Sequence, residues 1–430
     1  MEFLLGYKLT IVFLVILGYS CIIFEHISKI HKSAIALMLA VSCWAVYFLY
    51  SGTPLQEAML SLEEHLAKMS QIVFFLIGAM VIVEMVDAHE GFNFIANHIR
   101  SNSRTKMLWI IGLSTFFLSA ILDNLTTTIA MISIIRKLIK DKEDKWLLGS
   151  MVVIAANTGG AWTPIGDITT TMLWINGNIT TFSVIKELFL PCLISLTVSL
   201  ITYQLIFLRK KEKISPAKPI SLKSNNNSVL MFCTGVGLLV FVPIFKSLTH
   251  LPPYMCMLIS LSLLWIFTDL LYYNKPDKKH LKIPEIMKNI DIPSALFFAG
   301  ILLSVSVLES SGVLKDLTIV VNAYLVDEKI IATSIGLLSA IVDNVPLVAT
   351  SMSMYDLQAF PVDSSFWQMT AYCSGTGGSI LIIGSAAGIA LMGMEKVDFF
   401  WYLRKISLPA LTGYFAGIIS YLLINQLLSL

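Results

Sequence analysis

"SAILDNLTTTIAM", residues 119–131, places a carboxylate, an amide and threonine hydroxyls inside an otherwise apolar stretch. An aspartate at the centre of a membrane span costs roughly 2.5 to 3.5 kcal/mol on insertion scales. Carboxylates that are kept at that cost usually serve ion or proton pathways. The stretch therefore predicts a site for an ion or a proton, provided that it lies within a membrane.

The composition of the chain places this stretch in a membrane protein. Hydrophobic residues make up 56% of the 430 residues and charged residues 13%, which fits no soluble class. Apolar runs of roughly 20 residues, long enough to cross a bilayer, recur along the whole chain. The full spans predicted from them cover residues 3–24, 33–51, 69–87, 183–208, 229–248, 253–273, 293–310 and 406–428. The fold class is therefore an all-helical polytopic membrane protein.

The distribution of basic residues predicts a re-entrant hairpin around Asp123. Basic clusters over residues 98–106 and 136–145 flank the opening stretch, and such clusters face the cytoplasm under the positive-inside rule. If both ends are cytoplasmic, the chain enters the membrane, turns at Asp123 and Asn124, and leaves by the same side. This hairpin covers about residues 107–139. Its non-helical turn must be buried in protein or line a cavity.

The segment after the hairpin, at about residues 146–181, is predicted to be a broken helix. It carries "NTGGAWTPIGDITTTMLW" at residues 157–174, and its glycines and proline interrupt a helix. Unwound backbone frees carbonyl groups and half-helix ends present partial charges, which together form ion sites near the midplane of transporters. Asp167 follows the break directly.

The second half of the chain repeats the motifs of the first half in the same order. "SAIVDN" at residues 339–344 matches the start of the opening stretch, and "TGG" at 158–160 recurs at 376–378. "FFLIGAMVIVEMVDAHEG" at 74–91 likewise resembles "FFAGILLSVSVLESSG" at 297–312. The charges give the two halves opposite orientations, and inverted repeats with paired broken helices are typical of secondary transporters.

The predicted organisation therefore consists of two inverted repeats, with about ten transmembrane helices and two re-entrant hairpins in total. The first repeat covers residues 1–208, and a cytoplasmic linker covers residues 209–228. The second repeat covers residues 229–430. Within it, the hairpin is expected at about 328–357 and the broken helix at about 366–394.

The quoted stretches resemble the signature sequences of NhaD-type sodium/proton antiporters, within the ion transporter superfamily that also contains arsenite and citrate or dicarboxylate carriers. The resemblance is carried by residues 119–131, 157–174, 339–349 and 375–393, and it extends over about residues 70–425. It implies the export of Na+ or Li+ in exchange for protons, without a cofactor. The ion-binding or proton-binding residues that it implies are Asp123, Asn124, Thr126, Asn157, Thr158, Asp167, Thr169, Thr170, Asp343 and Asn344.

The chemistry of these residues suits a small hard cation. Na+ prefers oxygen ligands, which carboxylates, amides, hydroxyls and freed backbone carbonyls supply. Two buried carboxylates that lie close together titrate as a coupled pair, so protons and Na+ compete for the same oxygens. The repeats differ at residues 167–170 and 385–388, which read "DITT" and "SAAG". We therefore expect one asymmetric site in the first half, with Na+ at Asp123 and Asp167.

Several of these residues also have a purely structural interpretation. Asp123 and Asp343 can cap the returning legs of their hairpins, and threonine hydroxyls can bond backbone carbonyls in tight helix packing. Glu84 is either a side chain that snorkels to the membrane surface or part of a proton path. His89 could sense cytoplasmic pH, because imidazole titrates in that range.

Two other functions fit parts of the sequence. A sodium-coupled or proton-coupled anion carrier of dicarboxylate, citrate or arsenite type could use the same scaffold, with the acids holding only the coupling ion. The intramembrane ionisable groups identified above are all acidic, which favours a cation as the substrate. An intramembrane aspartyl protease would need two buried aspartates, but its motif fragments at 164–167 and 355–356 stand in the wrong order. We therefore expect no enzyme.

The expected partners are Na+, Li+, H+ and the lipid bilayer, and no nucleic acid. The superfamily resemblance implies a homodimer. The predicted location is the inner membrane of a bacterium, with the linker at 209–228 on the cytoplasmic side.

Overall fold

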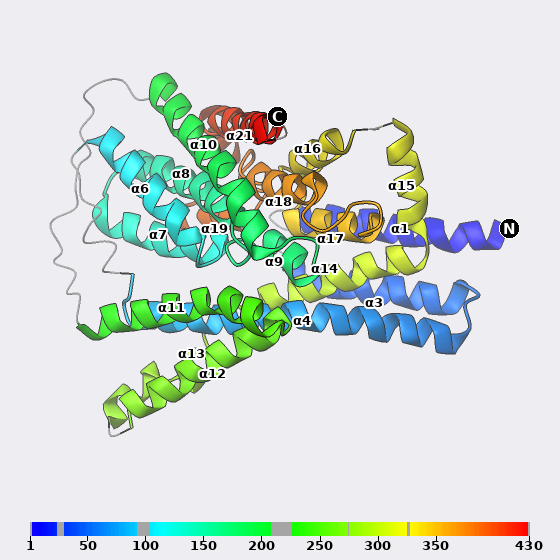
Figure 1. The fold of residues 1–430 in the computed structure, drawn as a ribbon, viewed down its shortest axis with the longest axis horizontal. Coiled ribbons are helices and arrows are strands. Elements are labelled where there is room, and N and C mark those ends of the chain that lie inside the picture. Colours follow the sequence, from blue (N-terminus) through cyan, green and yellow to red (C-terminus); the bar gives the residue numbers. More distant parts are fainter. Residues whose placement is uncertain are drawn as a thin grey trace.

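The computed structural model shows a protein built from helices that are joined by short loops (Figure 1). It describes residues 2–23, 30–92, 103–207, 226–273, 275–324 and 327–428. These ranges contain no β-strand, which confirms the predicted all-helical class. Residues 209–225 of the predicted linker lie outside the described residues.

Seven helices in the described ranges are long and apolar enough to cross a membrane. They are α3 (Lys32–Tyr50), α4 (Leu55–Ala88), α10 (Thr181–Phe207), α11 (Asn226–Thr249), α12 (Pro253–Leu271), α14 (Ile292–Ser310) and α21 (Ser407–Leu428). The N-terminal α1 (Glu2–Ile23) is a further apolar helix. The chain is therefore an integral membrane protein with several spans, as predicted.

Helix α4 begins earlier than the span predicted for it at 69–87. The predicted span began after the charged residues Glu63, Glu64 and Lys68, whereas the helix runs through all three. Leucine, glutamate, alanine and methionine are strong helix formers, and Lys68 Nζ lies 2.8 Å from Glu64 Oε1, one turn away. Hydropathy therefore marks where the apolar part of α4 begins, but not where the helix begins.

Two helical hairpins and two interrupted helices carry the sequence motifs. They are α6 (Arg104–Ser119) with α7 (Asn124–Leu138), α8 (Lys142–Gly160) with α9 (Ile168–Ile175), α16 (Glu328–Leu338) with α17 (Asn344–Met354), and α18 (Ser365–Gly377) with α19 (Ala386–Glu395). The remaining short helices are η1 (Pro276–Leu281), α13 (Ile283–Ile286), α15 (Val313–Tyr324) and α20 (Phe399–Lys405). The re-entrant course of the hairpins and the opposite orientation of the two halves stay predictions.

The second leg of each motif begins with a polar side chain that accepts a backbone N–H. Asp123 caps α7, Asp167 caps α9, Asp343 caps α17 and Ser385 caps α19. Such a cap satisfies one of the donors that the first helical turn leaves without a partner. Inside a membrane these donors have no water to bond, so the caps stabilise the breaks that the motifs require.

The same side-chain hydrogen bond joins the hairpin to the interrupted helix in both halves. Ser119 Oγ donates to Ala156 O at 2.6 Å, and Ser339 Oγ donates to Ser374 O at 2.8 Å. Each serine stands four residues before the aspartate of its hairpin turn. The repeated motif in the sequence therefore corresponds to a repeated contact in the structure.

A close approach of two backbones accompanies this contact in each half. A Cβ added at Gly159 would overlap the carbonyl oxygen of Phe116, and one added at Gly377 would overlap that of Gly336. Glycine therefore allows α8 to lie against α6, and α18 against α16, at a distance that no side chain permits.

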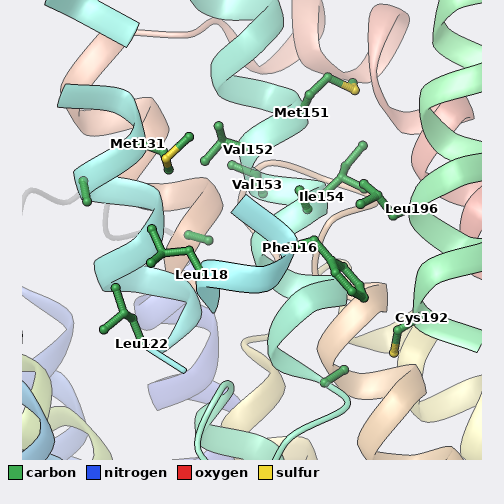
Figure 2. Close-up of a cluster of buried hydrophobic side chains, with 14 of the residues drawn as sticks. Phe116, Leu118, Leu122, Met131, Met151, Val152, Val153, Ile154, Cys192 and Leu196 are labelled. Atoms are coloured by element: carbon green, nitrogen blue, oxygen red, sulfur yellow. The ribbon is translucent and has the colours of Figure 1, made fainter. Parts of the chain in front are cut away.

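Buried apolar side chains hold these elements to the helices around them. In Figure 2, Phe116 of α6 lies among Val153 of α8 and Cys192 and Leu196 of α10, and all four are fully buried. Around this core, α10 packs along α21 and α3 packs along α14 (Figure 1). Each of these pairs joins a helix of the first half to a helix of the second, so the halves are interlocked.

The close approach at Gly159 generates a test of the fold. We expect Gly159→Ala to destabilise the protein by about 1–3 kcal/mol, because overpacking forces the α6 and α8 backbones apart. The readout is the temperature at which the detergent-solubilised protein loses its monodisperse elution peak. Gly237→Ala in α11, where nothing lies within 4 Å of the added carbon, is the matched control. Equal melting temperatures for the two variants would contradict the contact.

Candidate functional site

Asp123 stands at the turn of the first hairpin, and both of its oxygens are used within the first turn of α7. Its Oδ1 accepts the backbone N–H of Thr126 at 2.8 Å, and its Oδ2 accepts the Thr126 hydroxyl at 2.7 Å. The carboxylate is therefore fixed in position by the residue three places after it. It is half-buried and forms part of the wall of a cavity.

This cavity, which we call the acidic cavity, has a volume of about 220 Å³ and is lined by residues of α4, α7, α9 and the start of α14. Its carboxylates are Glu84, Asp87, Asp123 and Asp291. No lysine or arginine is among the described residues that line it. A hollow lined by one sign of charge with apolar walls concentrates ions of the opposite sign. The acidic cavity is therefore suited to attract a cation to Asp123.

Asp167 is the more deeply buried carboxylate, with 1% of its surface exposed. Its Oδ1 accepts the backbone N–H of Thr169 at 3.2 Å. Its Oδ2 has no hydrogen-bond partner among the described residues, and neither has the nearby hydroxyl of Thr169. A Cβ added at Gly375 would lie 3.0 Å from that Oδ2, so the free oxygen faces the second half of the chain. A buried oxygen without a partner costs free energy that a bound cation or proton recovers.

Asn157 links the first hairpin to the interrupted helix of the second half. Its Oδ1 accepts a hydrogen bond from Asn124 Nδ2 at 3.0 Å. Its Nδ2 donates to the hydroxyls of Ser379 at 2.8 Å and Ser385 at 3.0 Å. All four side chains are buried. Sequence reasoning did not select Ser379 or Ser385, although the alignment of Ser385 with Asp167 was a signal that could have found it.

Two of the predicted threonine ligands bond to the backbone. Thr158 Oγ1 donates to Ile154 O at 2.7 Å, and Thr170 Oγ1 donates to Ala161 O at 3.3 Å. These bonds match the structural interpretation of the threonines. A hydroxyl that donates keeps lone pairs on its oxygen, so both residues retain the capacity to coordinate a cation.

Comparison with known proteins assigns the chain to a family. Residues 19–362 match the protein-family model described as Citrate transporter. The chain belongs to this family. It is 52% identical to a protein of Arabidopsis thaliana named Sodium/proton antiporter 1, across 96% of this chain and 71% of that protein. A protein of Vibrio cholerae named Na(+)/H(+) antiporter NhaD is 29% identical, across 98% of this chain and 92% of that protein.

These relatives confirm the resemblance to NhaD-type antiporters within the Citrate transporter family. A second Arabidopsis thaliana relative, named Sodium/proton antiporter 2, is 50% identical across 95% of this chain and 98% of that protein. The three names describe antiporters and not enzymes, which agrees with the predicted transporter and disagrees with the protease alternative.

In this member of the Citrate transporter family, Asp343 has a partner that the sequence did not predict. Its Oδ1 accepts the backbone N–H of Val345 at 3.2 Å, while its Oδ2 lies 3.8 Å from Lys32 Nζ. The intramembrane ionisable groups considered in the sequence did not include this lysine. Lys32 stands within a basic cluster at the end of a span, and its four-carbon stem reaches the second hairpin from there. The amide nitrogen of Asn344 is buried without a partner among the described residues.

Glu84 and His89 lie in different surroundings at the end of α4. Glu84 lines the acidic cavity beside Asp87. His89, just after α4, is buried, with Nδ1 2.8 Å from Met85 O, Nε2 2.9 Å from the Tyr272 hydroxyl, and its ring stacked on that of Tyr272. Burial lowers the pKa of His89 below its usual value, an effect that the bond to Met85 partly offsets. The imidazole is therefore neutral at neutral pH, which restricts any sensing role to acid conditions.

The buried neutral imidazole predicts an acid sensitivity of the fold. In the unfolded chain His89 takes up a proton near pH 6.5, but the buried ring resists it, so folding stability falls as the pH drops below that value. We expect His89→Gln to lose less thermal stability than the wild type between pH 7 and about pH 5. The exposed His250→Gln is the control. Identical pH dependence of melting in His89→Gln and wild type would contradict the prediction.

Proposed function

We propose that this chain exchanges Na+ or Li+ for protons across its membrane, with one cation site in the first half. The observation that carries the proposal is the buried Oδ2 of Asp167, which has no hydrogen-bond partner among the described residues. Relatives at 52% and 50% identity that are named sodium/proton antiporters support it.

The proposed site uses carboxylates for charge and neutral oxygens for coordination. Asp123 and Asp167 hold the cation or, in its absence, protons, because both ligands compete for the same oxygens. Thr126 and Thr169 contribute hydroxyl oxygens beside these carboxylates, which suits a hard cation. Asn157 connects the two halves of the chain through its hydrogen bonds to Asn124, Ser379 and Ser385. The predicted ligands that complete this set are Asn124, Thr158 and Thr170, whereas the predicted residues Asp343 and Asn344 belong to the second hairpin and are not part of this first-half site.

Two hollows at successive positions along the half-helix α9 support alternating access to this site. Ile168 and Thr171 line the acidic cavity. Met172 and Asn176, about one turn further along α9, line a second cavity of about 270 Å³ that also contains Glu309. Because α9 lines both hollows and is capped by Asp167, a small movement of α9 would change which hollow gives access to the carboxylate.

The membrane potential can drive such an exchange. If one more proton than Na+ crosses in each cycle, each 100 mV supplies about 2.3 kcal/mol. That energy allows Na+ to be exported against its gradient.

A carrier of citrate or a related carboxylate is the second candidate, because the matching family model is described as Citrate transporter. In that case the acids would hold only a coupling cation. The acidic cavity disfavours an organic anion, since four carboxylates line it and no described lining residue is a lysine or arginine.

We also propose that the chain lies in a bacterial inner membrane and that it forms a homodimer. The bacterial inner membrane is supported by the relative from Vibrio cholerae, whereas the relatives at 50% identity or more come from a plant. Fractionation of the membranes of the source cell, with the chain detected by a tag, decides the location. Cross-linking in the membrane tests the proposed homodimer.

Transport is tested in proteoliposomes that hold a proton gradient reported by a fluorescent pH probe. Na+, Li+, K+, citrate and arsenite are added in turn. We expect Na+ and Li+ to dissipate the gradient with saturation, and K+ to have no effect. No response to the cations, together with Na+-dependent uptake of labelled citrate, would instead establish the carboxylate carrier.

The two carboxylates are tested in the same assay. We expect Asp123→Asn and Asp167→Asn each to lower the rate of exchange at least about tenfold, equivalent to about 1.4 kcal/mol, because asparagine keeps the helix cap but removes the charge. Asp356→Asn is the matched control, since Asp356 is exposed and also accepts backbone N–H groups in a loop. Retained exchange in either variant, after normal insertion, would remove that aspartate from the site.

A further inference from the structure

The two hairpins share an Asp–Asn turn but differ in the residues that follow it. These residues are Leu-Thr-Thr-Thr in the first hairpin and Val-Pro-Leu-Val in the second. The Thr126 hydroxyl donates to Asp123 Oδ2, whereas Pro346 stands at the equivalent position after Asp343 and has no hydroxyl. The second hairpin therefore lacks the threonine hydroxyls that follow the carboxylate in the first hairpin.

A lysine, and not a hydroxyl, lies beside the second oxygen of Asp343. Lys32 Nζ lies 3.8 Å from Asp343 Oδ2, and only 14% and 11% of the two side chains are exposed. The same ammonium lies 4.4 Å from the centre of the Phe297 ring, within range of a cation–π interaction. Lys32 is the first residue of α3, whose packing along α14 positions it between Asp343 and Phe297.

The interrupted helix of the second half lacks a carboxylate as well. Ser385 stands where the first half has Asp167, and its hydroxyl binds Asn157 Nδ2 and caps the N–H of Gly388. The first half thus combines two carboxylates with threonine hydroxyls. The second hairpin has one carboxylate, Asp343, which lies beside the ammonium group of Lys32 from α3 of the first half.

From this difference we infer that Lys32 is the resident cation of the second hairpin, a role that rests on the proposed cation exchange. Its ammonium group occupies the position next to Asp343 that a transported Na+ would otherwise take. Asp343 then binds no Na+ in the wild-type protein. The number of cations bound in each cycle is set by the carboxylates of the first half alone.

In this ion pair each side chain compensates the charge of the other. A buried carboxylate without a counter-ion, or a buried ammonium without one, is strongly unfavourable, while the neutral pair of side chains leaves no charge uncompensated. If the ammonium is removed and Asp343 kept, the vacated position is open to a cation from solution. A second Na+ site then appears in the molecule.

Equilibrium binding of radioactive sodium to the full-length purified chain tests this inference. We expect Lys32→Gln to bind one more Na+ per chain than the wild type at saturation. The double variant Lys32→Gln with Asp343→Asn should return to the wild-type number, and should keep the wild-type rate of exchange in proteoliposomes within about twofold, because neither charge remains. Asp343→Asn alone removes this carboxylate from beside the ammonium group, and we expect it to exchange more slowly than the double variant.

Lys8→Gln is the matched control. Lys8 forms an ion pair with Asp316, with 2.8 Å between Nζ and Oδ2, in a more exposed position between α1 and α15. Its removal should leave the number of bound Na+ ions unchanged. A rise in that variant would show that loss of any lysine raises Na+ binding, and would overturn the assignment to Lys32.

Two further results would overturn the inference, and they are distinguishable from failure of the proposed function. Unchanged Na+ binding in Lys32→Gln would show that the ammonium does not exclude a cation. Loss of Na+ binding in the double variant would show that Asp343 is itself a ligand of the transported ion. If the wild type binds no Na+ and shows no Na+-dependent proton flux, the proposed exchange fails instead.

Discussion

The structure depends on satisfying the backbone at helix starts that lie within the membrane protein and away from water. Donors at such positions must be bonded by the protein itself. At α7, α9 and α17 the cap is an aspartate. A carboxylate has two oxygens, and one of them is sufficient for the cap. The other is bonded to the Thr126 hydroxyl at Asp123, is free at Asp167, and lies beside an ammonium group at Asp343. Helix capping and the cation chemistry that we propose therefore use different atoms of the same side chains.

The central polar groups also connect the two halves of the chain. Asn157 of the first half bonds the hydroxyls of Ser379 and Ser385 in the second, and Asp167 Oδ2 faces Gly375. These contacts lie among fully buried apolar side chains, where polar bonds are costly to break without replacement. A cation or proton bound at Asp167, as we propose, would therefore lie directly against the second half.

Much of the fold was predictable from sequence, since long apolar runs, helix breakers and a repeated motif are local signals. The spans, the breaks before Asn124 and Asp167 and the capping role of Asp123 follow from such signals. The start of α4 did not, because hydropathy does not register a charged helical extension. Lys32 was missed because a lysine at a span end usually lies in water, and its partner Asp343 is distant in the sequence. Ser379 and Ser385 were missed because their importance comes from Asn157, which only the tertiary structure brings to them.

The glycine contacts at Gly159 and Gly377 have a mechanical consequence. Where two backbones touch without intervening side chains, neither helix can rotate or slide without a collision. The contacting helices, α6 with α8 and α16 with α18, are therefore expected to move as two stiff pairs. Any opening toward the opposite face of the membrane must be accommodated where packing is made by side chains, as between α10 and α21 or between α3 and α14. The two stiff pairs would then move without internal change, and the relative motion would occur at the outer helix pairs.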